Sequence, residues 1–153
     1  MIKIIDGNLF DSKANIICHQ CNCQGVMGSG VAAEARYRYP NVFEAYRKDY
    51  LDGKLELGYV CFATAKQDQV IANMCAQHIF GYDSGIYTNY DALQRCLDKV
   101  KAYAVFEYDV KPVIAFPYLM SCRRGGGDWN VVYKMIEDTF AEFDVEIWRF
   151  DNG

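Results

Sequence analysis

Residues 18–36, CHQCNCQGVMGSGVAAEAR, constrain the fold more than any other stretch, because three glycines fall between an apolar run and a helix-forming run. Residues 15–18 have strand character, and the residues after the last glycine favour a helix. Gly25, Gly28 and Gly30 let the backbone adopt positive φ and approach a ligand closely. The N–H groups at the start of the following helix attract negative charge. The stretch therefore predicts a strand, a glycine loop and a helix, with a phosphate or diphosphate as the natural ligand.

The glycine spacing alone does not identify the loop. It is not the G-x-G-x-x-G pattern of dinucleotide-binding folds, and it lacks the Gly-Lys-Ser/Thr ending of a P-loop. A glycine-rich turn that only connects two elements is therefore an open alternative.

Length and composition indicate one globular domain over residues 1–153, with a core of its own. The chain is 52% hydrophobic and 24% charged, which excludes a disordered protein. Its net charge of −4 argues against a broad nucleic-acid surface, although Arg123 and Arg124 form a local basic pair. We therefore expect a small-molecule partner.

The chain has no apolar run near the roughly 18–20 residues of a membrane span, and residues 1–6 do not resemble a signal peptide. We expect a cytoplasmic protein without a membrane partner. Seven cysteines, an odd number, fit a reducing compartment. Cys18, Cys21 and Cys23 with His19 suggest zinc, but no second cluster completes a set of four ligands. We expect neither a metal nor a cofactor.

Strand and helix signals alternate along the whole chain, which predicts a single α/β domain with a central sheet. Strands are expected at residues 3–5, 15–18, 58–65, 70–75, 112–117 and 145–150. The apolar residues of the first of these are nearly continuous, as in a sheet covered on both faces. A helix after Gly30 breaks at Pro40 and resumes, and another follows a Thr88-x-x-Asp91 capping box as far as about residue 107.

A second glycine-rich loop, residues 121–128 (SCRRGGGD), follows the strand at 112–117. Asp128 or its neighbour can cap the helix that comes next. In α/β sheets of this kind, ligands bind at the carboxyl ends of the strands, where both glycine loops fall. The two loops therefore define the expected site.

Three blocks of sequence resemble the macrodomain family, which binds ADP-ribose. They are the CHQCNC segment at 18–23 with its glycine loop, the YPxxFxxY pattern at 39–46, and GGGDW at 125–129. The similarity runs from GNLF at 7–10 to the last strand. It is closest to the compact branch that includes ADP-ribosyl hydrolases and yeast-type ADP-ribose 1''-phosphate phosphatases. The resemblance implies a three-layer α/β/α fold around a mixed, mostly parallel sheet.

The resemblance also assigns expected roles by position. Asn8 and Leu9 would meet the adenine edge, Asn22 the distal ribose, and Asp128 would lie near C1'' of that ribose. The diphosphate would be bound by Gly28, Ser29, Gly30 and Val31 on one side, and by Ser121, Cys122, Arg123, Arg124, Gly125, Gly126 and Gly127 on the other.

The chain departs from the family pattern at three places. Asn8 stands where most members have Asp, and it would contact the adenine amino group as a neutral partner. His19 and Asn22 stand where many members have an Asn-containing pair, as the phosphatase branch has. The lysine that some hydrolases of this branch use for covalent attack should fall near Gln77. Because Gln cannot form a Schiff base, that route is closed.

Each candidate residue also has a structural alternative. His19 suits proton transfer or phosphate binding, but it can equally be a core histidine bonded to a carbonyl group. Asp128 can orient water or only cap a helix. Arg123 and Arg124 can bind phosphate or be solvated. Tyr82 and Tyr87 can close over a ligand or belong to the core, and His78 has no assigned role.

Two functions follow. The first is a metal-independent hydrolase that acts at C1'' of an ADP-ribose derivative, with Asp128 and His19 as catalytic residues and ADP-ribose 1''-phosphate as the favoured substrate. The second is a module that binds ADP-ribose, or an ADP-ribosylated macromolecule, without turnover. Removal of ADP-ribose from protein or DNA is a weaker alternative to both.

Overall fold

The computed structural model describes residues 1–28, 30–78, 87–122 and 126–150. The strands are β1 (Ile2–Asp6), β2 (Ile16–Asn22), β3 (Val60–Lys66), β4 (Gln69–Gln77), β5 (Ile114–Pro117) and β6 (Val145–Arg149). The helices are α1 (Gly30–Arg38), α2 (Pro40–Leu51), α3 (Tyr90–Phe106) and α4 (Trp129–Thr139), with a short 3-10 helix η1 (Leu9–Asp11).

The six strands form one sheet in the order β1-β6-β5-β2-β4-β3. Every neighbouring pair is parallel except β3 and β4, which form an antiparallel pair at one edge. The expectation of a mixed, mostly parallel sheet is confirmed. Because β2, β4 and β5 are parallel neighbours, their carboxyl ends meet at one edge of the sheet, which we call the carboxyl edge.

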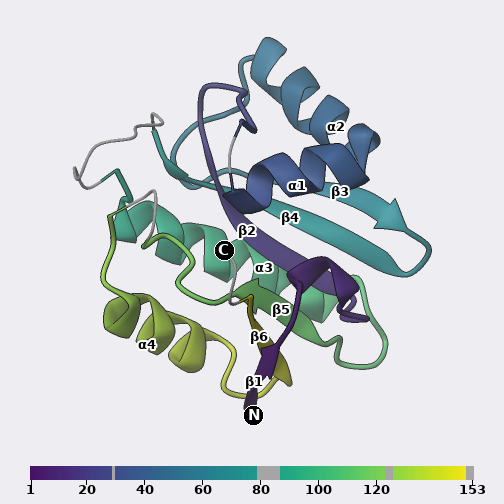
Figure 1. The fold of residues 1–153 in the computed structure, drawn as a ribbon, viewed down its shortest axis with the longest axis vertical. Coiled ribbons are helices and arrows are strands. Elements are labelled where there is room, and N and C mark those ends of the chain that lie inside the picture. The colour runs from purple at the N-terminus through teal and green to yellow at the C-terminus, as the bar shows by residue number, and fades with distance from the viewer. Residues whose placement is uncertain (29, 79–86, 123–125, 151–153) are drawn as a thin grey trace.

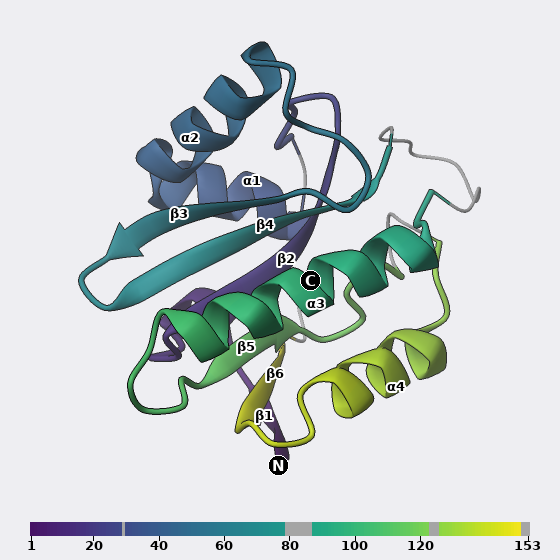
Figure 2. The same ribbon diagram turned by 180° about the vertical axis from the view of Figure 1, so that it is seen from behind.

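Helices cover both faces of this sheet (Figures 1 and 2). α1 and α2 lie on one face, where Ile17 and Val42 are buried together. α3 and α4 lie on the other, where Leu97 and Ile136 pack with Phe116 of β5. The expected three-layer α/β/α arrangement is therefore confirmed.

Two of the expected strands are wrong in part. β2 continues to Asn22, four residues beyond the expected end at Cys18, because it pairs with β4 along its whole length. β1 is not covered on both faces: it lies at the edge of the sheet, and the side chain of Ile4 is 51% exposed.

The helix boundaries follow the predicted signals with one exception. Pro40 is the first residue of α2, and the side chain of Asp128 caps α4 by accepting a hydrogen bond from the Asn130 N–H. The cap of α3 is Asn89, not Thr88, because the Thr88 hydroxyl donates to the backbone oxygen of Ser121. Thr88 thus joins two parts of the chain instead of starting a helix.

Candidate functional site

The two predicted glycine loops both lie at the carboxyl edge of the sheet. The first loop, residues 23–30, leaves β2 and enters α1, and the second loop, residues 121–128, follows β5 and enters α4. Ser29 of the first loop and Arg123, Arg124 and Gly125 of the second lie outside the described residues, as does Tyr82.

Asn22 organises the first loop from within. Its Oδ1 accepts a hydrogen bond from the Gln24 N–H at 2.9 Å, and its Nδ2 donates to the backbone oxygen of Val26 at 2.9 Å. From α2, the hydroxyl of Tyr46 donates to the backbone oxygen of Asn22 at 2.6 Å. Asn22 is buried, so the residue expected to meet the distal ribose also fixes the loop that would surround that ribose.

The backbone of the first loop needs glycine at two of the three predicted positions. Gly25 and Gly30 have φ of +73° and +60°, whereas Gly28 does not have positive φ, against the prediction. At Gly25 a Cβ atom would lie 2.7 Å from Cγ of Tyr50 and 2.8 Å from Nη1 of Arg47. The loop therefore packs directly against α2, and no larger residue fits there without displacing that contact.

The second loop is closed at its base by Ser121. The backbone oxygen of Ser121 accepts hydrogen bonds from the Gly127 N–H and from Oγ1 of Thr88, each at 2.8 Å. Ser121 itself has φ of 71°, an unfavourable value for a residue with a side chain. A Cβ atom at Gly127 would lie 2.8 Å from the same oxygen, so glycine is required for this closure.

A polar network absent from our predictions connects β2 and β4 to the second loop. Nε2 of Gln20 donates to Oγ1 of Thr88 at 2.9 Å and to Oε1 of Gln77 at 3.1 Å, while Oγ of Ser121 donates to Oε1 of Gln20. The network therefore joins the ends of β2 and β4 to the second loop. Polar side chains near the carboxyl ends of neighbouring strands were the signal that could have revealed it.

His19 lies inside the protein, between the sheet and the α1/α2 layer. Its side chain is 1% exposed, and Nε2 lies 2.6 Å from Oδ1 of Asn73, whose Nδ2 donates to the backbone oxygen of Cys61. Since Oδ1 can only accept, Nε2 carries the proton. Burial lowers the pKa of His19 to about 4, so the ring is neutral at pH 7. His19 thus holds β2 to β4, and its catalytic role stays a prediction.

Asp128 is exposed at the end of the second loop. Its carboxylate caps α4, and its backbone N–H donates to the hydroxyl of Tyr90 at 2.8 Å. Burial raises the pKa of the nearby Cys122 thiol to about 11, and the negative charge of Asp128 adds to this shift. Asp128 therefore presents an accessible carboxylate at the end of the second loop.

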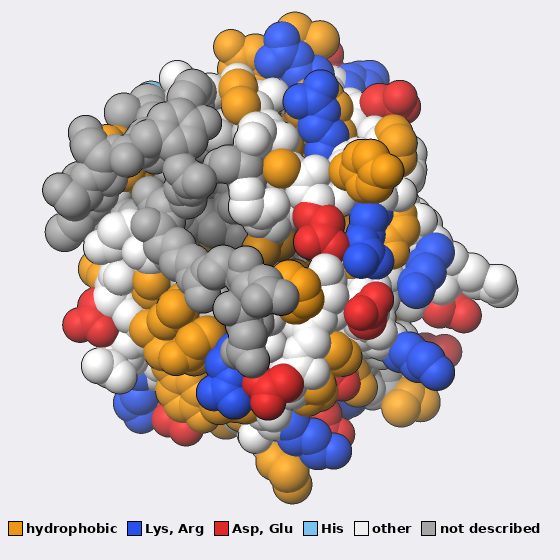
Figure 3. All heavy atoms as spheres, viewed as in Figure 1, with side chains coloured by type: hydrophobic (Ala, Val, Ile, Leu, Met, Phe, Trp, Pro, Cys, Tyr) orange, Lys and Arg blue, Asp and Glu red, His pale blue; other side chains and the backbone are white. Residues whose placement is uncertain are grey.

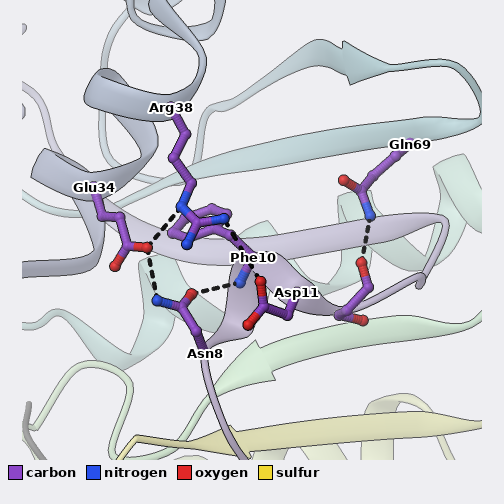
Figure 4. A network of polar contacts seen from close by, with 7 residues as sticks. Asn8, Phe10, Asp11, Glu34, Arg38 and Gln69 are labelled. Carbon is purple, nitrogen blue, oxygen red and sulfur yellow. Dashed lines mark hydrogen bonds and ion pairs between the residues drawn. The ribbon is translucent and has the colours of Figure 1, made fainter.

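Asn8 and Leu9 lie where β1 ends. Oδ1 of Asn8 accepts a hydrogen bond from the Phe10 N–H, and Nδ2 donates to Oε2 of Glu34 in α1 (Figure 4). Leu9 is buried against the face covered by α1 and α2. The residues expected at the adenine edge are thus fixed to the helix that follows the first loop.

The cysteines near His19 do not converge on a common point. Cys18 belongs to the core on the α3/α4 side, whereas Cys21 and Cys23 belong to a cluster with Tyr46 on the other side. Within the described parts of the chain, no group of three His, Cys, Asp or Glu side chains is placed to hold a metal ion.

The surface in Figure 3 carries acidic and basic side chains side by side, and hydrophobic side chains gather over α4. No helix among the described residues combines the length and apolarity that crossing a membrane requires.

No family model matches the chain. Over 155 residues it is 21% identical to a DNA ADP-ribosyl glycohydrolase of Thermus aquaticus, with 99% of this chain and 41% of that protein covered. Over 150 residues it is 24% identical to an uncharacterized 17.5 kDa protein of Enterobacteria phage T4, with 96% and 95% covered. A match of 52 residues at 38% identity, covering 30% of each chain, links it to an ADP-ribose 1''-phosphate phosphatase of Scheffersomyces stipitis. The match thus spans less than half the length of the glycohydrolase and of the phosphatase.

Solved structures share the fold over nearly the whole chain. A protein of unknown function from Bacteroides thetaiotaomicron has a TM-score of 0.88 at 27% identity, covering 97% of this chain and 98% of that one. A macrodomain protein from Streptomyces coelicolor has a TM-score of 0.80 at 25% identity, covering 97% and 98%. Thermosipho africanus DarTG, solved in complex with ADP-ribose, has a TM-score of 0.79 at 18% identity, covering 99% of this chain and 42% of that one.

Proposed function

Because the chain belongs to the macrodomain family, we propose that it binds ADP-ribose at the carboxyl edge of the sheet, between the first and second loops. The observation that carries this proposal is the connection of β2, from which the first loop starts, to the second loop through Gln20, Thr88 and Ser121. A site made of two loops needs a fixed distance between them to hold a diphosphate. The hydrogen bonds between β2 and the second loop help to supply that distance before any ligand arrives.

We further propose that the protein is a hydrolase acting at C1'' of ADP-ribose derivatives, with ADP-ribose 1''-phosphate as its substrate. Among relatives with a known activity, one is named a DNA ADP-ribosyl glycohydrolase and another an ADP-ribose 1''-phosphate phosphatase. The substituent at C1'' differs between these two reactions, whereas the ADP-ribose is common to both. The lysine of a lysine-dependent enzyme is expected near Gln77 and is absent there, which favours a phosphatase or a binding module over a hydrolase of that kind.

In this mechanism Asp128 holds and activates the attacking water. The water oxygen attacks phosphorus while one of its protons passes to the Asp128 carboxylate. The bond between phosphorus and the C1'' oxygen breaks, and that oxygen takes a proton from solvent, which yields ADP-ribose and inorganic phosphate. Hydrolysis of a phosphate ester requires a positioned nucleophile and compensation of negative charge. Asp128 supplies the first, and the second is assigned to Arg123, Arg124 and loop N–H groups.

The role of His19 in this mechanism differs from the proton transfer or phosphate binding that the sequence suggests. It is covered, neutral at pH 7 and bonded to Asn73. We propose that it supports the reaction by holding β2, from which the first loop starts, to β4. A direct role in proton transfer is the alternative that its substitution tests.

A module that binds ADP-ribose without turnover is the second candidate function. The buried position of His19 favours this binding module. Of the two predicted catalytic residues, only Asp128 is accessible to a ligand as an acid or base. Hydrolysis of ADP-ribose from protein or DNA is the third candidate, since a relative is named for the DNA reaction.

One panel of assays separates these functions. Purified protein would be given ADP-ribose 1''-phosphate, ADP-ribosylated protein and ADP-ribosylated DNA, while phosphate and ADP-ribose release are measured with and without a chelator. We expect phosphate release from the first substrate, unchanged by the chelator. Binding of ADP-ribose without release from any substrate would identify a binding module, and no binding at millimolar concentration would contradict the whole proposal.

A further inference from the structure

Four cysteine side chains lie together next to the start of the first loop, on the face of the sheet covered by α1 and α2. They are Cys21 of β2, Cys23 of the loop, Cys61 of β3 and Cys75 of β4, and they pack in one buried cluster with Tyr46. The proposed function uses none of these thiols. Sulfur atoms from three strands thus meet one thiol that belongs to the first loop itself.

Cys23 is kept beside Cys75 by contacts on both sides of residue 23. Sγ of Cys75 lies 3.7 Å from the backbone oxygen of Asn22, the residue before Cys23. The backbone N–H of Cys23 donates to the backbone oxygen of His78 at 3.1 Å, three residues beyond Cys75. Between these two contacts, the sulfur of Cys23 accepts a hydrogen bond from the Cys75 thiol. The start of the first loop is therefore attached to the end of β4 with two thiols side by side.

The two thiols differ in the charge that they carry. The hydrogen bond from Cys75 lowers the pKa of the Cys23 thiol to about 7, against the effect of burial, and the nearby His78 adds to this shift. The same hydrogen bond, together with burial, raises the pKa of Cys75 well above its usual range. Cys23 thus supplies a thiolate near pH 7, the nucleophilic form of cysteine, while Cys75 keeps its proton. Cys23 is also the most exposed thiol of the cluster, at 7%, whereas Cys75 is 0% exposed.

We propose that Cys23 is a site of oxidation by hydroperoxides, and that Cys75 converts the oxidised form into a disulfide. In the first step the Cys23 thiolate attacks one oxygen of hydrogen peroxide, the O–O bond breaks, and a sulfenic acid and a hydroxide ion form. In the second step the sulfur of Cys75 attacks the sulfur of the sulfenic acid. Its thiol proton and the departing hydroxyl group leave as water. Two electrons pass from the sulfur atoms to the peroxide, which is the only oxidant that the reaction needs.

The disulfide should change the first loop. It holds its two sulfur atoms about 2 Å apart, closer than two hydrogen-bonded thiols, so residue 23 must move toward β4. It also removes the S–H of Cys75 next to the backbone oxygen of Asn22, whose side chain organises the loop. This consequence rests on the proposed function, in which the first loop binds ADP-ribose. We therefore expect the oxidised protein to bind ADP-ribose less tightly.

Peptide mapping of the wild-type protein tests the oxidation site. The protein is treated with hydrogen peroxide, its remaining thiols are alkylated, and it is digested with trypsin without a reductant. Mass spectrometry should find peptide 14–36 joined to peptide 67–95, in which Cys75 is the only cysteine, with the loss of two hydrogen atoms. Because peptide 14–36 contains three cysteines, Cys23→Ser identifies the partner and should abolish the link. Cys61→Ser, the same change elsewhere in the cluster, is the matched control and should keep it.

Cys75→Ala provides a second test, because it removes the resolving thiol. Cys23 should then stop at the sulfenic acid, which dimedone traps. No joined peptides in the oxidised wild-type protein, or a link that persists in Cys23→Ser, would overturn the proposal. The wild-type map decides this even if a variant fails to fold.

Titration calorimetry tests the effect on the loop. After the peroxide is removed, oxidised wild-type protein should bind ADP-ribose about tenfold more weakly than reduced protein, and dithiothreitol should restore the affinity. Equal affinities with the disulfide present would overturn the effect on the loop and leave the oxidation site standing. Failure of the reduced protein to bind ADP-ribose would instead contradict the proposed function, while the peptide map would still decide the oxidation site.

Discussion

The Nε2–H of His19 donates to Oδ1 of Asn73 at 2.6 Å, across the pair formed by β2 and β4. Both side chains are almost completely buried, and Nδ2 of Asn73 donates a hydrogen bond to the backbone oxygen of Cys61 in β3. Three strands are thus joined by a polar contact in the layer beneath the first loop. Because the imidazole must stay neutral there, the contact makes stability depend on pH.

We expect the free energy of unfolding to fall as the pH drops from about 6.5 to about 4. Burial lowers the pKa of His19 to about 4, whereas the unfolded chain has the ordinary value near 6.5. In this range the unfolded state therefore binds the extra proton, which favours unfolding. The loss should reach roughly 2 to 3 kcal/mol near pH 4.5. Urea denaturation at about pH 7.5 and 4.5 measures it.

His19→Gln is the control for this measurement, since glutamine can donate to Asn73 but does not titrate. Between the two pH values, the free energy of unfolding of His19→Gln should fall by roughly 2 to 3 kcal/mol less than that of the wild-type protein. Equal losses in the two proteins would show that the imidazole does not cause the pH dependence.

Asp128→Asn should lower turnover by roughly a hundredfold or more, the usual contribution of a general acid or base, while ADP-ribose affinity changes less. Asparagine caps helices as well as aspartate does, so α4 and the melting temperature should be retained. Asp128→Ala should lose the cap as well, at a cost of about 1 kcal/mol. Full turnover by Asp128→Asn on every substrate would reduce Asp128 to a helix cap.

Gly25→Ala should weaken ADP-ribose binding about tenfold or more, since the methyl group would displace the first loop from Tyr50 and Arg47. Gly53→Ala is the matched control, because Gly53 has a similar φ of +75° but no atom within 4 Å of the added Cβ. Both variants carry the same backbone strain, so calorimetry isolates the steric effect at the loop. Equal affinities in the two variants would contradict the proposed packing.

Thr88→Val should weaken the attachment of the second loop to β2. It removes one of two donors to the Ser121 oxygen, which keeps the Gly127 N–H, and one of two acceptors for Nε2 of Gln20, which keeps Oε1 of Gln77. Each lost hydrogen bond should therefore cost about 1 kcal/mol. We expect a lower melting temperature and weaker binding of ADP-ribose. Thr64→Val, at an exposed position of β3, should change the free energy of unfolding by less than about 0.5 kcal/mol. Thr88→Val with wild-type affinity would show that the loops keep their spacing by other contacts.

The fold was largely predictable because local signals agree with the tertiary structure. Apolar runs predicted all six strands of the sheet, Pro40 marked the break between α1 and α2, and Asp128 was recognised as a cap. The exposure of Ile4 could not be predicted, since it depends on the position of β1 at the edge of the sheet.

The interior of the site was harder to predict because its polar side chains are satisfied by residues distant in sequence. His19 and Gln20 look like the start of a loop, yet they continue a buried strand by bonding to Asn73 and Thr88. In the sequence Thr88 resembles a helix cap, but in the structure its hydroxyl donates to the backbone oxygen of Ser121, which is distant in sequence. The positions of the ligand loops could thus be predicted, and the network that joins β2 and β4 to the second loop could not.

The pairing of β1 with β6 alone has a consequence for the order of folding. Ile2 of β1 is in register with Val145 of β6, so this contact closes a loop of nearly the whole chain, while β3 and β4 are joined by a tight turn at Asp68. Closing a long loop costs more conformational entropy than closing a short one. We therefore expect the β3–β4 hairpin to form early and β1 to add last. Pulsed hydrogen exchange during refolding should show the amides of β4 protected before those of β1.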